Sequence, residues 1–156
     1  MQEVNHMTTE TTYFGEVEYG EEELIHFPKG LYGFEDETDF LLIDFGADSG
    51  VLSLQSVKTP QLSFVLMHPF SLAPDYAPQL QDEELQALQA ERSEDLYYYV
   101  LCAVKEPVPE STVNLQCPVA INPDTRQAMQ VILESGQWHM RHRLADLEAA
   151  REGKSC

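Results

Sequence analysis

The sequence predicts an all-β class, namely a single-domain antiparallel β-barrel-like fold with one or two short helices. The length of 156 residues suits one domain. About eight to ten short apolar or alternating runs, bounded by turn residues, recur at roughly regular spacing. Only one stretch has a clear helical pattern. A barrel and a sandwich both fit these observations, and periodicity alone does not choose between them.

Three segments are expected along the chain. Residues 1–12 hold few large apolar side chains and are expected to form a flexible N-terminal tail. The β-barrel-like domain would then span residues 13–144. Residues 145–156 would add a short C-terminal helix, which the pattern over 144–151 indicates, followed by a tail.

The N-terminal half of the domain predicts two hairpins. Apolar residues alternate with glutamates over 14–19 and an apolar run follows at 24–27, so these segments are expected to pair across the turn 20–23. The β-favouring runs 40–45 and 51–57 flank a Gly-Ala-Asp-Ser-Gly turn cluster and predict the second hairpin.

The C-terminal half predicts a helix and further strands. Acidic residues in the first turn of 82–91 suit the positive end of a helix dipole, and Leu85 and Leu88 would share one side. Pro118 implies an edge or a bulge in its strand. The expected strands cover 62–67, 96–105, 112–121, 127–133 and 137–143.

The most strongly specified turn lies between residues 25 and 35. Pro28 fixes its own φ and donates no backbone hydrogen bond, while Gly30 and Gly33 accept positive φ, so the chain should turn sharply twice. The carboxylates that follow are expected in solvent. On the apolar side we expect the aromatic residues Phe27, Tyr32 and Phe34.

Two amides stand inside otherwise apolar strands, Gln55 and Asn114. An unpaired amide in a half-buried strand would cost about 1–3 kcal/mol, so each is expected to have a backbone partner. A structural hydrogen bond is favoured over contact with a ligand. The residues expected to have structural roles are therefore Phe27, Pro28, Gly30, Gly33, Phe34, Gln55, Asn114 and Pro118.

The charge is strongly acidic, with 27 acidic against 9 basic residues and a formal net charge of −18. Such a field repels phosphate backbones, which disfavours direct binding of nucleic acid. It attracts basic proteins and speeds their association. A solvated, solubilising surface explains the charge equally well.

No catalytic, cofactor or metal motif is present, since GxSxG, GxGxxG, P-loop and HExxH patterns are all absent. His139 and His142 lie in a predicted strand, where their spacing points the rings to opposite faces. Cys102 and Cys117 are expected to be buried, inert thiols. The acidic run near residue 35 lacks the ligand order of a calcium loop. We therefore expect no enzyme activity and no cofactor.

The location is expected to be a reducing cytoplasm. Three cysteines give an odd count, and the chain starts without the basic and apolar regions of a signal peptide. No apolar run approaches the roughly 18 residues that a membrane helix needs. A protein that is monomeric when free is expected.

Four sequence blocks, in this order and spacing, resemble the FliW family of flagellar assembly factors, and the similarity extends from about residue 13 to residue 144. Tyr32 stands where proline is commoner, and Cys117 where alanine is usual. The blocks are IxFPxGLxGFE from Ile25, LQSV from Leu54, Phe64 with Pro69-Phe70, and TVNLxxPxxxN from Thr112.

The resemblance implies a compact, β-barrel-like cytoplasmic protein without enzymatic activity, which binds flagellin and the RNA-binding regulator CsrA. In such a partner switch, the free protein holds CsrA away from flagellin mRNA, and new flagellin competes for it. An acidic antagonist suits a basic regulator. The candidate contacts for CsrA are Glu21, Glu22, Glu23, Glu35, Asp36, Glu37, Asp82, Glu83 and Glu84.

Two rival functions remain open from the residues alone. A small hydrolase or metal-dependent enzyme on a β-barrel would need a convergent polar pocket that the sequence does not show. An oligonucleotide-binding barrel would suit the aromatic strands, but the charge has the wrong sign for it.

Overall fold

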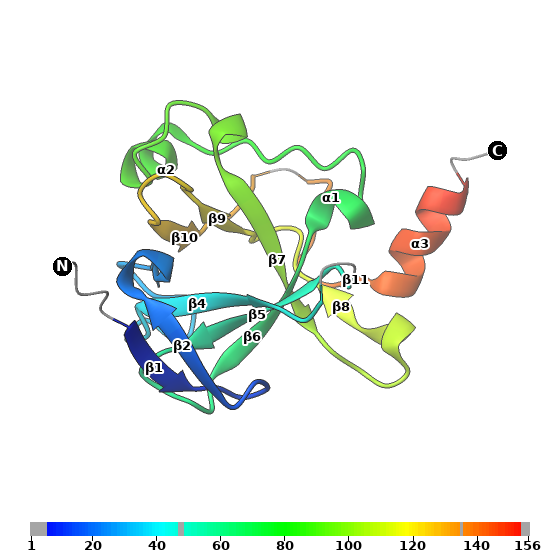
Figure 1. The fold of residues 1–156 in the computed structure, drawn as a ribbon. Coiled ribbons are helices and arrows are strands. Elements are labelled where there is room, and N and C mark those ends of the chain that lie inside the picture. The colour runs from blue at the N-terminus through cyan, green and yellow to red at the C-terminus, as the bar shows by residue number, and fades with distance from the viewer. Residues whose placement is uncertain (1–5, 47–48, 135, 154–156) are drawn as a thin grey trace.

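The computed structural model describes residues 6–46, 49–134 and 136–153 (Figure 1). The strands are β1 (His6–Glu10), β2 (Glu16–Gly20), β3 (Ile25–His26), β4 (Asp39–Asp44), β5 (Val51–Ser56), β6 (Ser63–Met67), β7 (Tyr97–Ala103), β8 (Thr112–Val113), β9 (Val119–Ile121), β10 (Ala128–Gln130) and β11 (His142–Arg143). The α-helices are α1 (Pro69–Leu72), α2 (Asp82–Ala87) and α3 (Leu144–Gly153). Three 3₁₀ turns are η1 (Glu21–Glu23), η2 (Ser93–Asp95) and η3 (Val108–Glu110).

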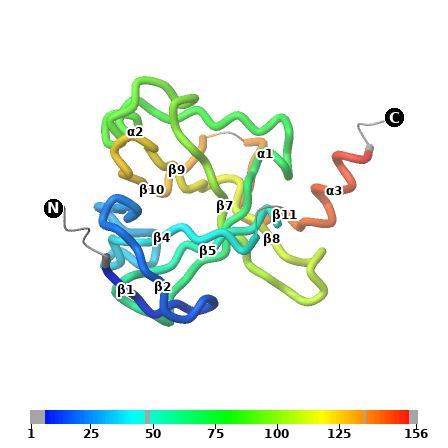
Figure 2. Tube along the Cα trace, viewed as in Figure 1, coloured from blue at the N-terminus to red at the C-terminus, as the bar shows by residue number. Residues whose placement is uncertain are grey.

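One antiparallel path runs through most of the strands, in the order β10-β9-β7-β6-β5-β4-β3. Strand β7 connects the two parts of this path, because it pairs with β6, β8 and β9 and crosses from one half of the molecule to the other (Figure 2). The two ends of the path are joined by a single parallel bridge between His26 and Gln127. The fold is therefore mostly β with three short helices, and no closed barrel is found among the described strands.

Two hydrophobic clusters make up most of the core. One includes Phe27, Phe40 and Leu54, and the rings of Phe27 and Phe40 meet edge to face at 5.3 Å. The other includes Leu88, Leu115 and Leu147 of α3, and residues of α1 and α2 pack against it. Strand β5 is buried from Leu52 to Ser56. The β1–β2 hairpin packs against β4 next to it, through Met7, Tyr19 and Leu41.

The prediction of a flexible tail over residues 1–12 is wrong from residue 6 onward, and residues 1–5 lie outside the described residues. Residues 6–10 form β1 and pair with β2 over five positions, and the backbone N–H of Thr12 donates to the buried amide oxygen of Gln55 at 2.8 Å. The expected pairing of 14–19 with 24–27 is also wrong, since β2 pairs with β1 and β3 pairs with β4. The η1 turn, in which Glu23 Oε2 accepts from the N–H of Gly20, separates β2 from β3.

Several other predicted strands and helices are confirmed, and some have different bounds. The hairpin of β4 and β5 is confirmed, as are β6 and β7, and the C-terminal helix is confirmed as α3. The helix expected over 82–91 is shorter, because Gln89 has a φ of +56° just beyond α2. The strand expected over 112–121 is divided into β8 and β9, and only the end of 137–143 is a strand. Helix α1 was not predicted.

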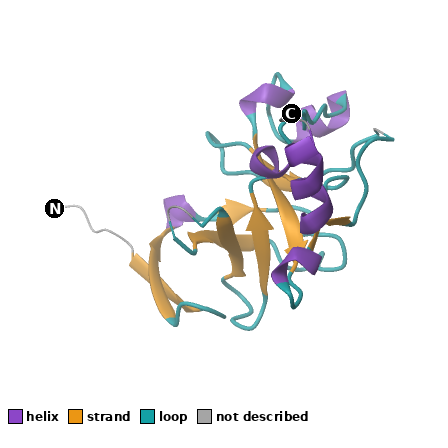
Figure 3. Ribbon diagram, turned by 90° about the vertical axis from the view of Figure 1, so that its right-hand side faces the viewer, coloured by secondary structure: helices purple, strands orange, loops and turns teal. Residues whose placement is uncertain are grey.

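The helices and the N-terminal hairpin occupy different sides. Helix α3 stands on the side opposite to β1 and β2 in Figure 1, and Figure 3 views the molecule from the α3 side. Among the described residues, none of the helices is both long enough and apolar enough to cross a membrane.

Candidate protein-interaction site

The loop between β3 and β4 is held in one conformation by its own backbone. Gly30 and Gly33 have φ values of +66° and +89°, which confirms the two predicted turns. Leu31 and Phe34 exchange backbone hydrogen bonds, and the N–H of Gly30 donates to the carbonyl of Phe27 at 2.8 Å. Phe27 and Leu31 are buried beneath the loop and anchor it to the core.

Tyr32 and Phe34 point the other way. Their exposed fractions are 56% and 41%, so the expectation that they lie on the apolar side is wrong. The reason is that Phe27 and Leu31 take the inward positions of the double turn. Phe34 rests against the half-buried ring of Phe64 at 5.1 Å, in an edge-to-face arrangement. Two aromatic rings are thus presented to solvent on a well-anchored loop.

The carboxylates of this loop differ from one another. Glu35 and Asp36 are exposed, as predicted, and Glu35 Oε2 accepts from the N–H of Gly33 at 2.8 Å. Glu37 accepts from the hydroxyls of Ser56 and Thr59 at 2.6 and 2.8 Å. The bond from Ser56 is the main cause that lowers the pKa of Glu37. Glu37 therefore has internal partners, whereas Glu35 and Asp36 face solvent.

The other two acidic segments are likewise exposed. Glu21, Glu22 and Glu23 form η1, and Asp82 and Glu83 begin α2. Glu84 is half-buried, and its Oε1 accepts from the N–H of Gln81 at 2.9 Å, which caps the helix. Among the described residues, no lysine, arginine or histidine pairs within 4.0 Å with any of the nine candidate carboxylates.

The β9–β10 hairpin connects all three acidic segments. Arg126 Nη2 donates to the carbonyl of Glu23 at 2.7 Å, which ties the hairpin to η1. Asn122 Nδ2 donates to the carbonyl of Leu88 at 2.7 Å, just after α2. Gln130 Oε1 accepts from the N–H of Tyr32 at 3.2 Å. Tyr32 belongs to the loop between β3 and β4, which we call the aromatic loop. Segments far apart in sequence therefore lie against the same hairpin, and we call the exposed carboxylates of η1, of the β3–β4 loop and of α2 the acidic face.

Arg126 bonds to the backbone beside this face rather than to its carboxylates. Its guanidinium bonds to the backbone carbonyls of Glu23 and Leu24 and to no carboxylate among the described residues. Desolvation raises the pKa of Tyr32, and electrostatic interactions with Cys117 and Glu84 raise it further. The negative charge of Glu84 in α2 therefore affects the pKa of Tyr32. Sequence reasoning assigned no role to Asn122, Arg126 or Gln130, although Asn122 belongs to one of the motif blocks.

Both predicted structural amides have backbone partners. Gln55 is fully buried, and its Nε2 donates to the carbonyls of Ser56, Pro60 and Leu62 at 3.0–3.1 Å. Asn114 is half-buried in the loop between β8 and β9, and its Oδ1 accepts from the N–H of Cys117 at 2.9 Å.

Two prolines of the motif blocks flank these features. Pro28 is exposed at the start of the aromatic loop. Pro118 is buried just before β9, where its carbonyl accepts from the N–H of Val131 at 3.0 Å. Pro118 therefore marks the break between β8 and β9 that the sequence indicated as an edge or a bulge.

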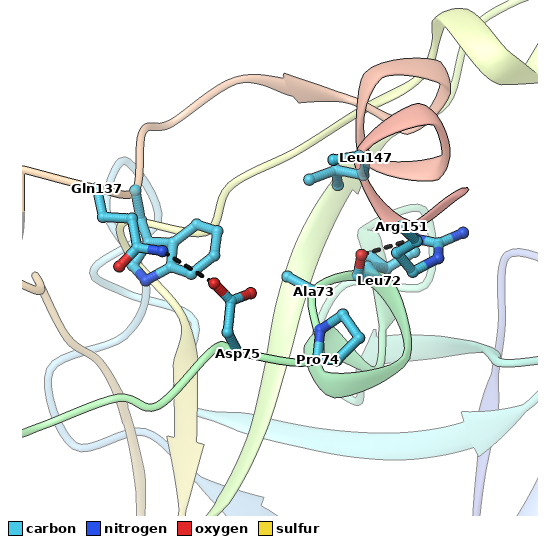
Figure 4. A pocket seen from close by; sticks show the side chains of 9 residues that line it. Leu72, Ala73, Pro74, Asp75, Gln137, Leu147 and Arg151 are labelled. Atoms are coloured by element: carbon cyan, nitrogen blue, oxygen red, sulfur yellow. Dashed lines mark hydrogen bonds between the residues drawn. The ribbon is translucent and has the colours of Figure 1, made fainter. Parts of the chain in front are cut away.

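A separate apolar groove lies between α1 and α3 (Figure 4). Its volume is about 570 Å³, and Leu72, Ala73 and Leu147 are among the residues that line it. Arg151 Nη1 donates to the carbonyl of Leu72 at 2.6 Å, so α3 is tied to α1 across one end of the groove. Gln137 Nε2 donates to Asp75 Oδ2 at 3.2 Å at the other end (Figure 4).

His139 and His142 do not point to opposite faces, because the segment before β11 is a loop rather than a strand. Their rings stack at 5.4 Å, and His142 Nε2 accepts from the backbone N–H of His139 at 2.8 Å. Trp138, which lines the groove, meets His142 edge to face at 5.9 Å. Within the ranges that the structure describes, no group of three or more His, Cys, Asp or Glu residues could hold a metal ion.

Acidification is expected to loosen this loop. Burial lowers the pKa of His142, the charge of His139 lowers it further, and Asp146 opposes both. The neutral ring is therefore favoured by folding. The contribution of the neutral His142 ring to the free energy of unfolding is complete above the ordinary histidine pKa of about 6.5 and is lost as the pH falls below it.

The measurement is the fluorescence of Trp138, the only tryptophan in the chain, between about pH 7.5 and pH 5. We expect a transition in this range, and a lower free energy of unfolding on its acid side. The variant His142→Gln should remove the transition, and His68→Gln, at an exposed position, should retain it. A transition that persists in His142→Gln would contradict the assignment.

Two cysteines are described, and both are free thiols. Cys117 is buried, as predicted, and Cys102 is half-buried. Burial raises the pKa of both thiols, which keeps them in the less reactive protonated form. The third cysteine, Cys156, lies outside the described residues.

The fold and the site define a small, mostly-β protein whose described residues present an acidic face and a separate apolar groove. A family model described as "FliW protein" matches residues 8–144. The "Flagellar assembly factor FliW" of Geobacillus sp. (strain WCH70) is 38% identical over 145 residues, which cover 93% of this chain and all of the relative. The protein of the same name from Symbiobacterium thermophilum is 39% identical over 135 residues, 84% of this chain and 98% of the relative.

A solved structure is similar as well. The "Crystal structure of the flagellar assembly factor FliW" superimposes with a TM-score of 0.83 and 38% identity, and the match covers 88% of this chain and 96% of that chain. The chain belongs to the FliW family of flagellar assembly factors.

Proposed function

We propose that this chain is a cytoplasmic flagellar assembly factor that sequesters CsrA and binds flagellin as a chaperone, so that the two partners compete for it. Free protein would hold CsrA away from flagellin mRNA, and accumulating flagellin would release CsrA to repress translation. Membership of the FliW family supports the flagellar role. The acidic face is the observation that supports a basic RNA-binding partner.

The position of the negative charge supports a basic partner as much as its amount does. Exposed carboxylates from η1, the aromatic loop and α2 converge around the β9–β10 hairpin, and among the described residues no base pairs with them. A basic surface would find complementary potential there and would associate faster for it. The same face repels RNA, so it suits an antagonist of an RNA-binding protein better than a second RNA binder.

Neutralising this face is expected to weaken CsrA binding. The double variant Asp36→Asn/Glu83→Gln removes one exposed carboxylate from each of two segments. Because these charges lie at the surface, we expect a roughly five- to tenfold loss of affinity at low salt, and a smaller difference at high salt. The measurement is calorimetric titration with purified CsrA over a salt series.

The matched control is Glu106→Gln/Glu148→Gln, which changes the net charge equally at exposed positions of the β7–β8 loop and α3. It should bind CsrA like the wild-type protein. If wild-type protein fails to bind CsrA even at low ionic strength, the antagonist function is excluded. If both double variants lose affinity equally, the charge acts as a whole and the acidic face has no special role.

The flagellin arm has its own test. Gel filtration of the chain with its cognate flagellin monomer should yield a stoichiometric complex, and flagellin added to the complex with CsrA should release CsrA. Two separate species on the column would argue against the chaperone role. A mobility shift of single-stranded RNA by this chain at low salt would instead favour the oligonucleotide-binding function.

A further inference from the structure

The aromatic loop has the physical character of a binding hot spot. Tyr32 and Phe34 expose 56% and 41% of their surface, although burial of aromatic rings is favourable. The double turn and the buried anchors Phe27 and Leu31 fix their backbone. Preorganised aromatic side chains that lose little freedom on binding are the residues most enriched at the energetic centres of interfaces.

The surroundings of the rings are acidic. Glu35 and Asp36 follow directly in the loop, and the hydrogen bond from the N–H of Gly33 holds the Glu35 carboxylate beside the turn. The charge of Glu84 in α2 also contributes to raising the pKa of Tyr32, after desolvation by burial. The rings are therefore flat, apolar surfaces bordered by negative charge.

We propose that the exposed rings of Tyr32 and Phe34, which we call the aromatic ridge, bind arginine side chains of a basic protein partner. A guanidinium group can stack on an aromatic face while it donates to a carboxylate beside it, and arginine does both better than lysine. This inference rests on the proposed function, because it supposes a basic partner on the acidic face. It adds which side chains of this protein make the contact and what the partner presents.

Charge opposes binding of a second copy of this chain at these rings. Each copy carries a formal net charge of −18, and a symmetric contact through the ridge would bring the loops with Glu35 and Asp36 together. Such like-charge contacts oppose association. A purely apolar partner segment would fit the rings but would leave these carboxylates without a complementary group.

The test uses the full chain with two probes, a nona-arginine peptide and a nona-lysine peptide, and with CsrA. The variants Tyr32→Ala and Phe34→Ala leave the charge unchanged. Each is expected to weaken binding of nona-arginine by about tenfold and to reduce the preference for arginine over lysine. Tyr32→Phe keeps the ring and should bind nearly as well as the wild-type protein.

The control is Phe70→Ala. Phe70 is 48% exposed and packs on Tyr76 and Tyr98, much as Phe34 packs on Phe64, but no carboxylate adjoins it in sequence. It should bind nona-arginine like the wild-type protein. Thermal unfolding followed by circular dichroism verifies that each variant is folded.

The outcomes separate the ridge from the proposed function. Equal binding of nona-arginine by wild-type protein and both ring variants means that charge alone attracts the peptide, which overturns the ridge while CsrA binding by wild-type protein still supports the function. Weakened peptide binding with no CsrA binding supports the ridge and excludes the function. Loss of self-association in Tyr32→Ala, seen by sedimentation, would assign the ridge to a second copy and overturn the inference.

Discussion

Replacement of Gln55 by leucine is expected to lower the free energy of unfolding by about 3 kcal/mol. The side chain is fully buried, and its amide joins three segments: the strand end at Ser56, the following turn, and the N-terminal segment at Thr12. Leucine has nearly the same size but pairs with none of them. The backbone groups at Thr12, Pro60 and Leu62 would each lose their hydrogen bond to the buried amide of Gln55.

The measurement is urea unfolding followed by circular dichroism, with Gln86→Leu as the control. Gln86 is exposed on α2, so its replacement should change the free energy of unfolding by less than about 0.5 kcal/mol. Hydrogen exchange gives a local measurement, because the amide of Thr12 should exchange faster in Gln55→Leu. A loss below about 1 kcal/mol, with Thr12 still protected, would show that the surrounding groups find other partners.

Replacement of Gly30 by alanine is expected to destabilise the protein by about 3 kcal/mol and to abolish the presentation of the aromatic ridge. Gly30 has a φ of +66°, which alanine adopts only with strain. In addition, an added Cβ would lie 2.6 Å from the Cα of Glu35 and would also contact the carbonyl oxygen of Phe34. These are backbone atoms, so the loop itself must move.

Gly33→Ala is the matched control in the same loop. Gly33 has a φ of +89°, but no atom lies within 4 Å of an added Cβ, so only the backbone strain of about 1 kcal/mol applies. We therefore expect Gly33→Ala to retain most of its affinity for the basic probes and Gly30→Ala to lose it. Equal unfolding midpoints for the two variants would show that the close backbone approach at Gly30 has no energetic consequence.

Local sequence patterns predicted the parts of the fold whose physics is local. The positive φ of Gly30 and Gly33 was predictable because only glycine adopts it without strain. The β4–β5 hairpin was predictable because two apolar runs flank a turn cluster. The backbone partners of Gln55 and Asn114 were predictable in kind, because buried amides are rarely left unpaired, but their identities were not.

Strand pairing was harder to predict from local sequence patterns. The alternation of β2 predicted a strand correctly, but it does not say which neighbour completes the ladder, and β1 provided a partner from a segment expected to be a tail. The break between β8 and β9 depends on the Asn114 bond to Cys117 and on long-range bonds from 131 and 133 to the intervening loop. Neither leaves a clear periodic signal.

The sequence by itself determined the family, the sign of the charge and the turn that carries the aromatic residues, because composition and turn chemistry are properties of short segments. The tertiary structure decided that Tyr32 and Phe34 face solvent, since Phe27 and Leu31 compete for the same core and bury instead. It also brought three acidic segments against the same β9–β10 hairpin. That convergence depends on Asn122, Arg126 and Gln130, whose contacts span up to 103 positions in the chain and exist only once the β9–β10 hairpin is in place.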